Sequence, residues 1–218
     1  MKLIKKLLLI TLNLKISHDD LNELIKWQEI YNFSEPFPTF IKKKVLKEYS
    51  SSSTIWVETG TLVGDTAKYL SKIAKFVYTI EPSEKYYNLS VKNLKNYENI
   101  KIYNATSENK LNDILEIIKP NSDVCFWLDG HWSGGDTFKG ETDTPILSEL
   151  ETIKRYLNKF SKLNILIDDF RIFDIGNNVD IYPSKEVLIE YAAKNNLNWR
   201  ITRDIFILSK EDIVENNI

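Results

Sequence analysis

Short apolar runs alternate with helical patterns along the chain after residue 54. The apolar runs predict strands over 55–57, 76–80, 100–103, 124–128 and 165–167. Apolar residues at helical spacing predict helices over 65–74, 83–94, 107–118, 145–160 and 183–194, and the segment 199–208 is typical of a closing β-hairpin. Five strand–helix units followed by a β pair predict an α/β fold with a doubly wound, mostly parallel seven-stranded sheet.

A helical segment precedes this alternating region. Apolar residues between 17 and 49 recur at near-helical spacing, and Pro36 and Pro38 divide the segment into two helices. We therefore expect an N-terminal helical cap over 1–53 and the sheet domain over 54–218. The lysine run 42–44 is interpreted as the solvated face of the second helix, in preference to an anion site. The amphipathic N-terminal segment is a candidate homodimer surface.

Composition excludes several classes of protein. The 218 residues carry 29 Lys+Arg and 31 Asp+Glu, and the net charge of -2 gives no basic footprint for nucleic acid. The single cysteine, Cys125, and two histidines exclude an internal disulfide and a zinc cluster, so that any metal is held mostly by oxygen. No apolar stretch approaches the ~18 residues of a membrane span. We expect a soluble cytoplasmic protein.

The ends of the first three strands carry the chemistry of a nucleoside site, because ligands of doubly wound sheets bind beyond the carboxyl ends of the strands. The first strand runs into the segment 58–64 (ETGTLVG), whose glycines allow a close backbone approach. The second ends at Glu81, a carboxylate placed to bind both hydroxyls of a ribose. The third is followed by 104–107 (NATS), which offers small polar groups to an adenine-like ring. This combination in this order favours a binding site over glycines that serve only packing.

The next two strands end in carboxylates. Asp129 follows the fourth strand, and Asp168 and Asp169 follow the fifth. Three crowded carboxylates repel one another unless a cation neutralises them, and oxygen ligands favour Mg²⁺, Mn²⁺ or Ca²⁺. The alternative is that Asp168 caps a turn and Asp169 is solvated.

These segments resemble the class I S-adenosylmethionine-dependent methyltransferases, in particular the metal-dependent O-methyltransferases of the catechol and macrocin type. The resemblance rests on the segments 58–64, 79–81, 128–132 and 167–169, and it covers about 54–171. The stretch 126–149 also resembles a bacterial methyltransferase-like family associated with surface-glycan genes. Catechol-type enzymes have a lysine base just after the first metal aspartate, where this chain has His131 and Trp132.

The resemblance implies a donor, a metal and an acceptor. The residues implied to bind S-adenosylmethionine are Glu58, Gly60, Thr61, Gly64, Asp65, Thr66, Glu81, Thr106, Ser107 and Asp129. The implied metal ligands are Asp129, Asp168 and Asp169, and the cation would hold a hydroxyl of a small molecule or sugar, as in carbohydrate biosynthesis. Asp129 and His131 are the implied catalytic residues. His131 is a candidate base, and a backbone-bonded structural histidine or a metal ligand are the alternatives.

Two other functions compete with this interpretation. A nicotinamide-dependent oxidoreductase on the same fold is disfavoured because Leu62 and Val63 do not supply the glycines of G-x-G-x-x-G. A non-catalytic nucleoside-binding module is disfavoured because it has no need of a buried acidic cluster. For methyl transfer, we expect the helices of 17–49 and the loop 170–182 to cover the crevice and exclude water.

Overall fold

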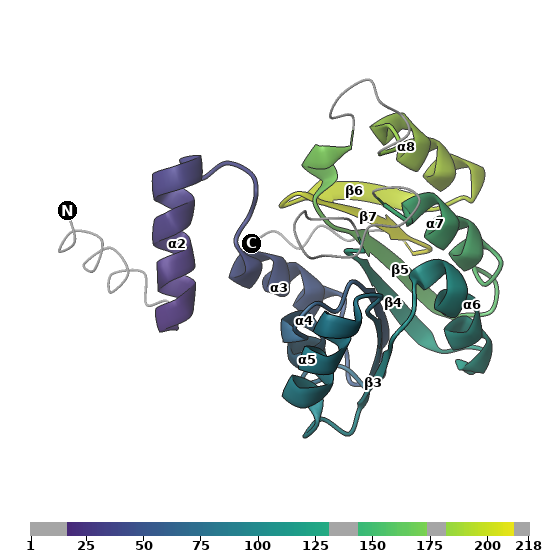
Figure 1. The fold of residues 1–218 in the computed structure, drawn as a ribbon. Coiled ribbons are helices and arrows are strands. Elements are labelled where there is room, and N and C mark those ends of the chain that lie inside the picture. The colour runs from purple at the N-terminus through teal and green to yellow at the C-terminus, as the bar shows by residue number, and fades with distance from the viewer. Residues whose placement is uncertain (1–16, 131–143, 174–181, 212–218) are drawn as a thin grey trace.

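A seven-stranded sheet lies at the centre of the molecule (Figure 1). The computed structural model describes residues 17–130, 144–173 and 182–211. The strands are β1 (Ile55–Thr59), β2 (Phe76–Ile80), β3 (Ile100–Tyr103), β4 (Asp123–Leu128), β5 (Lys162–Ile167), β6 (Asn198–Thr202) and β7 (Ile205–Ser209). Their order is β3-β2-β1-β4-β5-β7-β6, and β7 runs antiparallel to β5 and β6 whereas the other neighbours pair in parallel. The predicted doubly wound, mostly parallel seven-stranded sheet is confirmed.

Helices cover both faces of the sheet (Figure 1). They are α2 (His18–Tyr31), α3 (Thr39–Glu48), α4 (Asp65–Leu70), α5 (Glu84–Leu94), α6 (Ser107–Ile117), α7 (Ile146–Lys154) and α8 (Lys185–Lys194), with a 3₁₀ turn, η1 (Phe170–Ile172), after β5. Buried side chains of α3, α4 and α5 pack with one face of the strands. Those of α6, α7 and α8 pack with the other. The result is three layers, and the carboxyl ends of the parallel strands share one edge.

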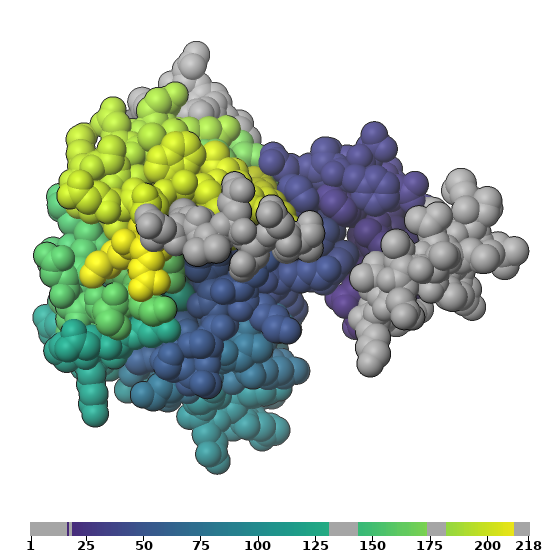
Figure 2. Space-filling model, turned by 180° about the vertical axis from the view of Figure 1, so that it is seen from behind, coloured from purple at the N-terminus to yellow at the C-terminus, as the bar shows by residue number. Residues whose placement is uncertain are grey.

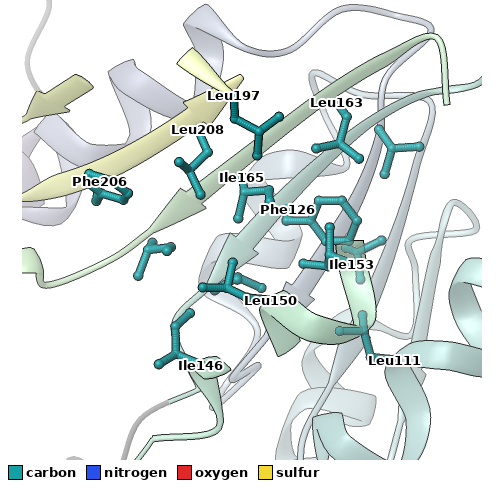
Figure 3. Close-up of a cluster of buried hydrophobic side chains, with 14 of the residues drawn as sticks. Leu111, Phe126, Ile146, Leu150, Ile153, Leu163, Ile165, Leu197, Phe206 and Leu208 are labelled. Atoms are coloured by element: carbon teal, nitrogen blue, oxygen red, sulfur yellow. The ribbon is translucent and has the colours of Figure 1, made fainter. Parts of the chain in front are cut away.

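The central strands are buried on both faces. In β4 every residue from Val124 to Leu128 is buried, with Cys125 facing the α3–α5 layer and Phe126 the α6–α8 layer. Figure 3 shows Phe126 and Ile165 against side chains of the covering helices, such as Ile153. Burial on both faces explains why these strands appear in the sequence as continuous apolar runs.

The two N-terminal helices differ in how they meet the sheet. The start of α2 has a capping box, in which Asp20 N–H donates to Ser17 Oγ at 3.1 Å. The described side chains of α2 include none that is fully buried, and α2 projects from the rest of the chain (Figure 2). In α3, by contrast, Val45 and Leu46 are fully buried among residues of the sheet, including Trp56. Therefore α3 is part of one helical layer.

Ion pairs connect the end of α3 with the β6–β7 hairpin. The carboxylate of Glu48 lies 3.3 Å from Arg200 Nη2 and 3.5 Å from Arg203 Nη1. These pairs and the burial of Val45 and Leu46 fix the helix beside the edge strands. Lys42, one turn earlier, is thereby held close to the end of β5.

Helix boundaries differ slightly from those the sequence predicts. Pro145 is the N-cap of α7 and not its first helical residue, although Thr144 Oγ1 accepts a hydrogen bond from Ile146 N–H at 3.4 Å. The same helix ends at Lys154, and residues 155–159 form turns in place of the predicted helix. Among the described helices, none has the length and apolar content that crossing a bilayer requires.

Candidate functional site

The turn after β1 has a backbone that requires glycine at two positions. Gly60 and Gly64 have φ of 87° and 90°. A Cβ on Gly60 would lie 2.5 Å from the carbonyl oxygen of Asp129, and one on Gly64 would lie 2.9 Å from Leu94 Cδ1. Gly60 therefore lets the β1 turn approach the end of β4, and Gly64 lets α4 begin against α5. The neighbour of Gly60 is backbone and that of Gly64 is a leucine side chain, and the close approach of a ligand to this turn stays a prediction.

Glu81 joins the end of β2 to this turn. Its Oε2 accepts a hydrogen bond from Leu62 N–H at 2.7 Å, and its Oε1 accepts one from Ser83 N–H at 2.9 Å. Burial raises the pKa of Glu81, whereas the two backbone donors lower it. Each carboxylate oxygen retains a second lone pair, so the group can also accept hydrogen bonds from a pair of hydroxyls.

A chain of hydrogen bonds lies beneath the turn. Thr79 Oγ1 donates to Glu58 Oε2 at 2.5 Å, and Thr61 Oγ1 lies 2.5 Å from Thr79 Oγ1. Burial raises the pKa of Glu58 to about 8, against the lowering effect of Thr79. Its Oε1 is buried and, among the described residues, lacks a hydrogen-bond partner. Glu58 is thus a carboxyl group kept neutral at the base of the site, with one oxygen still available.

The end of β3 lies beside the end of β2. Asn104 Nδ2 donates to the carbonyl oxygen of Glu81 at 2.9 Å. Thr106 is the N-cap of α6, and Ser107 in its first turn is buried. The structure therefore brings together the ends of β1, β2 and β3. Of the other predicted donor-binding residues, Asp65 is exposed and Thr66 is half-buried in the first turn of α4.

The two aspartates that follow β5 meet a lysine from α3. Lys42 Nζ lies 2.6 Å from Asp168 Oδ1 and 2.7 Å from Asp169 Oδ1, and only 13% of the Lys42 side chain is exposed. The interpretation of 42–44 as a solvated face is therefore wrong for Lys42. One face of α3 packs on the sheet, which turns this lysine inward while Lys44 stays exposed.

A second cation contacts the acidic pair from the side of η1. Arg171 Nη1 lies 2.7 Å from Asp169 Oδ1 and also contacts Asp204 Oδ2. Asp204, in the turn between β6 and β7, accepts a backbone hydrogen bond from Arg171 N–H at 2.7 Å. Asp169 has φ of 52°, and its N–H donates to Asp168 Oδ1 at 2.8 Å. The alternative in which Asp168 caps the turn and Asp169 is solvated is not what the structure shows. Asp169 itself is the N-cap of η1, without a side-chain cap bond, and its carboxylate is ion-paired.

The pKa shifts follow from burial and these pairs. Burial lowers the pKa of Lys42, but the charges of Asp168 and Asp169 outweigh it and raise the pKa overall. Burial also raises the pKa of Asp168 to about 6, against the lowering effect of Lys42. The pKa of Asp169 falls to about 2, because Lys42 and Arg171 together outweigh its burial. At neutral pH both aspartates are ionised.

Asp129 lies between the two groups of residues. Its N–H donates to the carbonyl oxygen of Thr59 at 3.1 Å, and Asp168 N–H donates to Leu128 O at 3.1 Å, so Asp129 and Asp168 leave neighbouring strands side by side. Burial raises the pKa of Asp129 well above its ordinary value, as do the charges of Asp168 and Asp169, while Lys42 lowers it. The predicted convergence of these carboxylates at one edge of the sheet is observed. His131 lies outside the described residues.

As arranged, these carboxylates do not fit a divalent metal. The described parts of the chain hold no group of three histidine, cysteine, aspartate or glutamate side chains placed to bind a metal ion. The ammonium of Lys42 contacts one oxygen each of Asp168 and Asp169, where a shared metal ion would have to bind. The metal site predicted at Asp129, Asp168 and Asp169 is therefore not formed by this arrangement, because the acid pair already has cationic partners.

A small cavity of about 10 Å³ opens beside these residues, and its lining includes Gly130, Glu149, Asp168 and Tyr182. Glu149 of α7 is 2% exposed, and within the described residues its Oε1 lacks a hydrogen-bond partner. Burial raises the pKa of Glu149 to about 7. A cavity of this size has room for about one water molecule.

Sequence reasoning did not identify Lys42, Glu149 or Asp204 as site residues. For Glu149 a signal was present, because it occupies the apolar face of its helix together with Ile146 and Ile153. For Asp204 the hairpin turn was visible, but not its pairing with a residue 33 positions earlier.

The strand order and the antiparallel β7 define the class I methyltransferase fold, and comparisons with solved structures agree. An O-methyltransferase from Bacillus cereus in complex with S-adenosylhomocysteine aligns with a TM-score of 0.58 and 15% identity over 92% of this chain and 94% of that chain. A candidate caffeoyl-CoA O-methyltransferase from Staphylococcus aureus aligns with a TM-score of 0.52 and 15% identity over 95% and 98%. A candidate rRNA methylase from Clostridium thermocellum aligns with a TM-score of 0.52 and 12% identity over 78% and 94%.

No family model and no curated protein sequence matches the chain. At these identities the structural likeness establishes the fold.

Proposed function

We propose that the protein is an S-adenosylmethionine-dependent methyltransferase that methylates a hydroxyl of a small molecule or sugar. The observation that carries this proposal is Glu81, a buried carboxylate at the end of β2 that also accepts Leu62 N–H from the β1 turn. In doubly wound folds this position binds the ribose of a nucleoside. Here it belongs to a sheet with the class I methyltransferase order.

The donor half of the site comprises the ends of β1, β2 and β3. Glu81 would accept hydrogen bonds from the two ribose hydroxyls through its remaining lone pairs. Thr106 and Ser107 would face the adenine ring from the start of α6. Glu58, whose Oε1 lacks a partner among the described residues, would form a hydrogen bond with the methionine end of the donor.

The donor supplies a methyl group on a positively charged sulfonium, which is an electrophile. The protein must orient the acceptor oxygen, accept its proton and exclude water. Asp129 lies between the donor half and the acidic pair, and a carboxylate with a raised pKa is suited to accept a proton. The oxygen then forms a bond to the methyl carbon, the carbon–sulfur bond breaks, and its electron pair stays on sulfur. His131 stays a second predicted base.

The rival nicotinamide function is less well supported by the topology. Dinucleotide-binding folds have the strand order 3-2-1-4-5-6. In this chain an antiparallel β7 lies between β5 and β6. A non-catalytic nucleoside-binding module would not require the Asp129, Asp168 and Lys42 arrangement beside the donor half.

Methyl transfer from labelled S-adenosylmethionine tests the proposal directly. The acceptor panel should contain catechols, free sugars and nucleotide sugars, with rRNA as a control, and mass spectrometry should locate the added methyl group. We expect an O-methylated small molecule and no labelled RNA, because the net charge of -2 offers no attraction to phosphates. Saturable binding of NAD⁺ without binding of S-adenosylhomocysteine would contradict the proposal.

A further inference from the structure

The contact between α3 and the end of β5 has the geometry of an occupied cation site. A single ammonium group, Lys42 Nζ, lies 2.6 Å and 2.7 Å from the Oδ1 atoms of Asp168 and Asp169. Only 6% and 15% of these aspartate side chains are exposed, which limits screening by water. The lysine reaches them from a position 127 residues away along the chain from Asp169.

Several independent contacts hold Lys42 in this position. Val45 and Leu46 are fully buried on the next turn of α3, and Glu48 pairs with Arg200 and Arg203. Arg171 and Asp204 fix the β5 side of the contact. The lysine is therefore held by the fold and does not rely on a flexible surface ion pair.

We propose that Lys42 takes the place of a divalent metal, so that methyl transfer by this protein is metal-independent. This inference rests on the proposed function. Lys42 Nζ donates to Asp169 Oδ1 and contacts Asp168 Oδ1. An ammonium has three N–H donors, so one of them would serve the acceptor oxygen. A hydrogen bond from a cation stabilises negative charge that develops on that oxygen as its proton leaves.

A bound divalent ion and Lys42 cannot share this site. Two cations that both contact Asp168 and Asp169 would lie only a few ångströms apart and would repel strongly in a buried setting. Removing Lys42 leaves the carboxylates without their shared cation. The variant Lys42→Met should therefore acquire the affinity for a metal that the wild-type protein lacks.

Mn²⁺ binding, measured by the electron paramagnetic resonance of free Mn²⁺, tests this step without any methyl-transfer assay. We expect Lys42→Met to bind Mn²⁺ at least about tenfold more tightly than the wild type, because Asp168 then loses this cationic partner and Asp169 retains Arg171, which it shares with Asp204. The matched control is Lys44→Met on the exposed face of the same helix, and it should behave as the wild type. Wild-type protein that binds Mn²⁺ as tightly as Lys42→Met would overturn the proposal.

Turnover gives the second test. The rate of wild-type methyl transfer should differ less than about twofold between EDTA and added Mn²⁺. Lys42→Met should lower kcat by about 100-fold, which is the size of effect seen when an oxyanion donor is lost. Its affinity for S-adenosylhomocysteine should stay within about threefold of wild type, and Lys42→Arg should recover part of kcat. Loss of wild-type activity in EDTA with recovery in Mn²⁺ would overturn the proposal.

The two tests separate failure of this inference from failure of the proposed function. Lack of binding to S-adenosylhomocysteine would remove the proposed function, while the Mn²⁺ titration would still decide what Lys42 replaces. Metal-dependent methyl transfer would overturn the role of Lys42 and leave the function intact. If Lys42→Met does not fold, the wild-type EDTA comparison and Lys42→Arg still decide the proposal.

Discussion

The two halves of the site stabilise their buried carboxyl groups in opposite ways. At the ends of β1 and β2, Glu58 and Glu81 have raised pKa values, and their partners are a threonine hydroxyl and backbone N–H groups. At the end of β5, Asp169 has a lowered pKa and lies between Lys42 and Arg171. In one half the carboxyl groups meet uncharged partners, and the other half is a dense array of ion pairs.

This difference suggests a division of labour. Carboxyl acceptors and backbone donors without a nearby cation suit the uncharged ribose and adenine of a nucleoside. Fixed charges around Lys42 and Asp168 suit a reaction in which an acceptor oxygen becomes negative. Asp129 lies at the boundary, since its N–H donates to the carbonyl oxygen of Thr59 at the end of β1, while burial and the charges of Asp168 and Asp169 raise its pKa.

The largest expected effect is on the pH dependence of stability. Glu58 has a pKa of about 8 in the folded chain against 4.5 ordinarily, so the folded state binds the proton more tightly. Its contribution is fully present below about pH 4.5 and is lost as the pH rises towards 8, a change of about 3–5 kcal/mol. Relative to wild type, Glu58→Gln should show a smaller fall of unfolding free energy between pH 5 and pH 9.

Urea denaturation at pH 5, 7 and 9 measures this change. Asp168 and Glu149, with pKa values of about 6 and 7, contribute falls of the same sign, as does Asp129 with its raised pKa. Both proteins contain these groups, so the difference between wild type and Glu58→Gln from pH 7 to 9 reports Glu58. Asp169, with a pKa of about 2, has the opposite sign and acts only below about pH 4. If the free energy of unfolding of wild type and of Glu58→Gln fell in parallel with pH, Glu58 would not be a carboxyl group kept neutral in the folded chain.

The next effect concerns Asp129, which lies between the two halves of the site. Asp129→Asn should lower kcat by about 100- to 1000-fold, the range seen when one catalytic group of a preorganised site is lost. Its affinity for S-adenosylhomocysteine should stay within about threefold of wild type. Calorimetry measures the affinity and steady-state kinetics measures kcat. Equal losses of affinity and of kcat would contradict the distinction between the two halves of the site.

A smaller effect is expected for the donor half. Glu81→Gln keeps the size of the side chain but replaces one carboxylate oxygen with an amide donor, which faces Leu62 N–H or Ser83 N–H. We expect affinity for S-adenosylhomocysteine to fall by about 10- to 100-fold, since hydrogen bonds to charged groups contribute about 1.5–3 kcal/mol. The kcat at saturating donor should change little, and a loss confined to kcat would contradict the assignment.

The smallest effect is expected at the edge of the ion-pair array. The side chain of Glu48 is 23% exposed, and its pairs with Arg200 and Arg203 are 3.3 Å and 3.5 Å long. Glu48→Gln should lower the free energy of unfolding by less than about 1 kcal/mol. Leu46→Ala, the control for burial of the same helix, should cost about 2–5 kcal/mol. A larger cost for Glu48→Gln would mean that charge and not packing holds α3.

Much of the fold could be predicted from the sequence because local patterns determine it. Buried parallel strands appear as apolar runs, so the bounds of β2 and β3 were predicted to the residue. The convergence of Asp129 with Asp168 also followed, since residues after neighbouring parallel strands share one edge of the sheet.

The ion pairs could not be predicted in the same way. The partner of Asp168 comes from α3, and its approach depends on how Val45 and Leu46 pack against the sheet. A run of three lysines does not reveal which of them turns inward. The same limit applies to Asp204, whose pairing with Arg171 depends on the position of the β6–β7 turn beside η1.

Backbone amide NMR during titration with S-adenosylhomocysteine tests the central claim most directly, because it locates the ligand as well as detecting it. The account predicts saturable shifts clustered at Leu62, Ser83 and Ser107, the ends of β1, β2 and β3, with smaller changes at Arg171. Absence of saturable shifts, or shifts concentrated around Arg171 and Asp204 with none at Leu62 and Ser83, would contradict it.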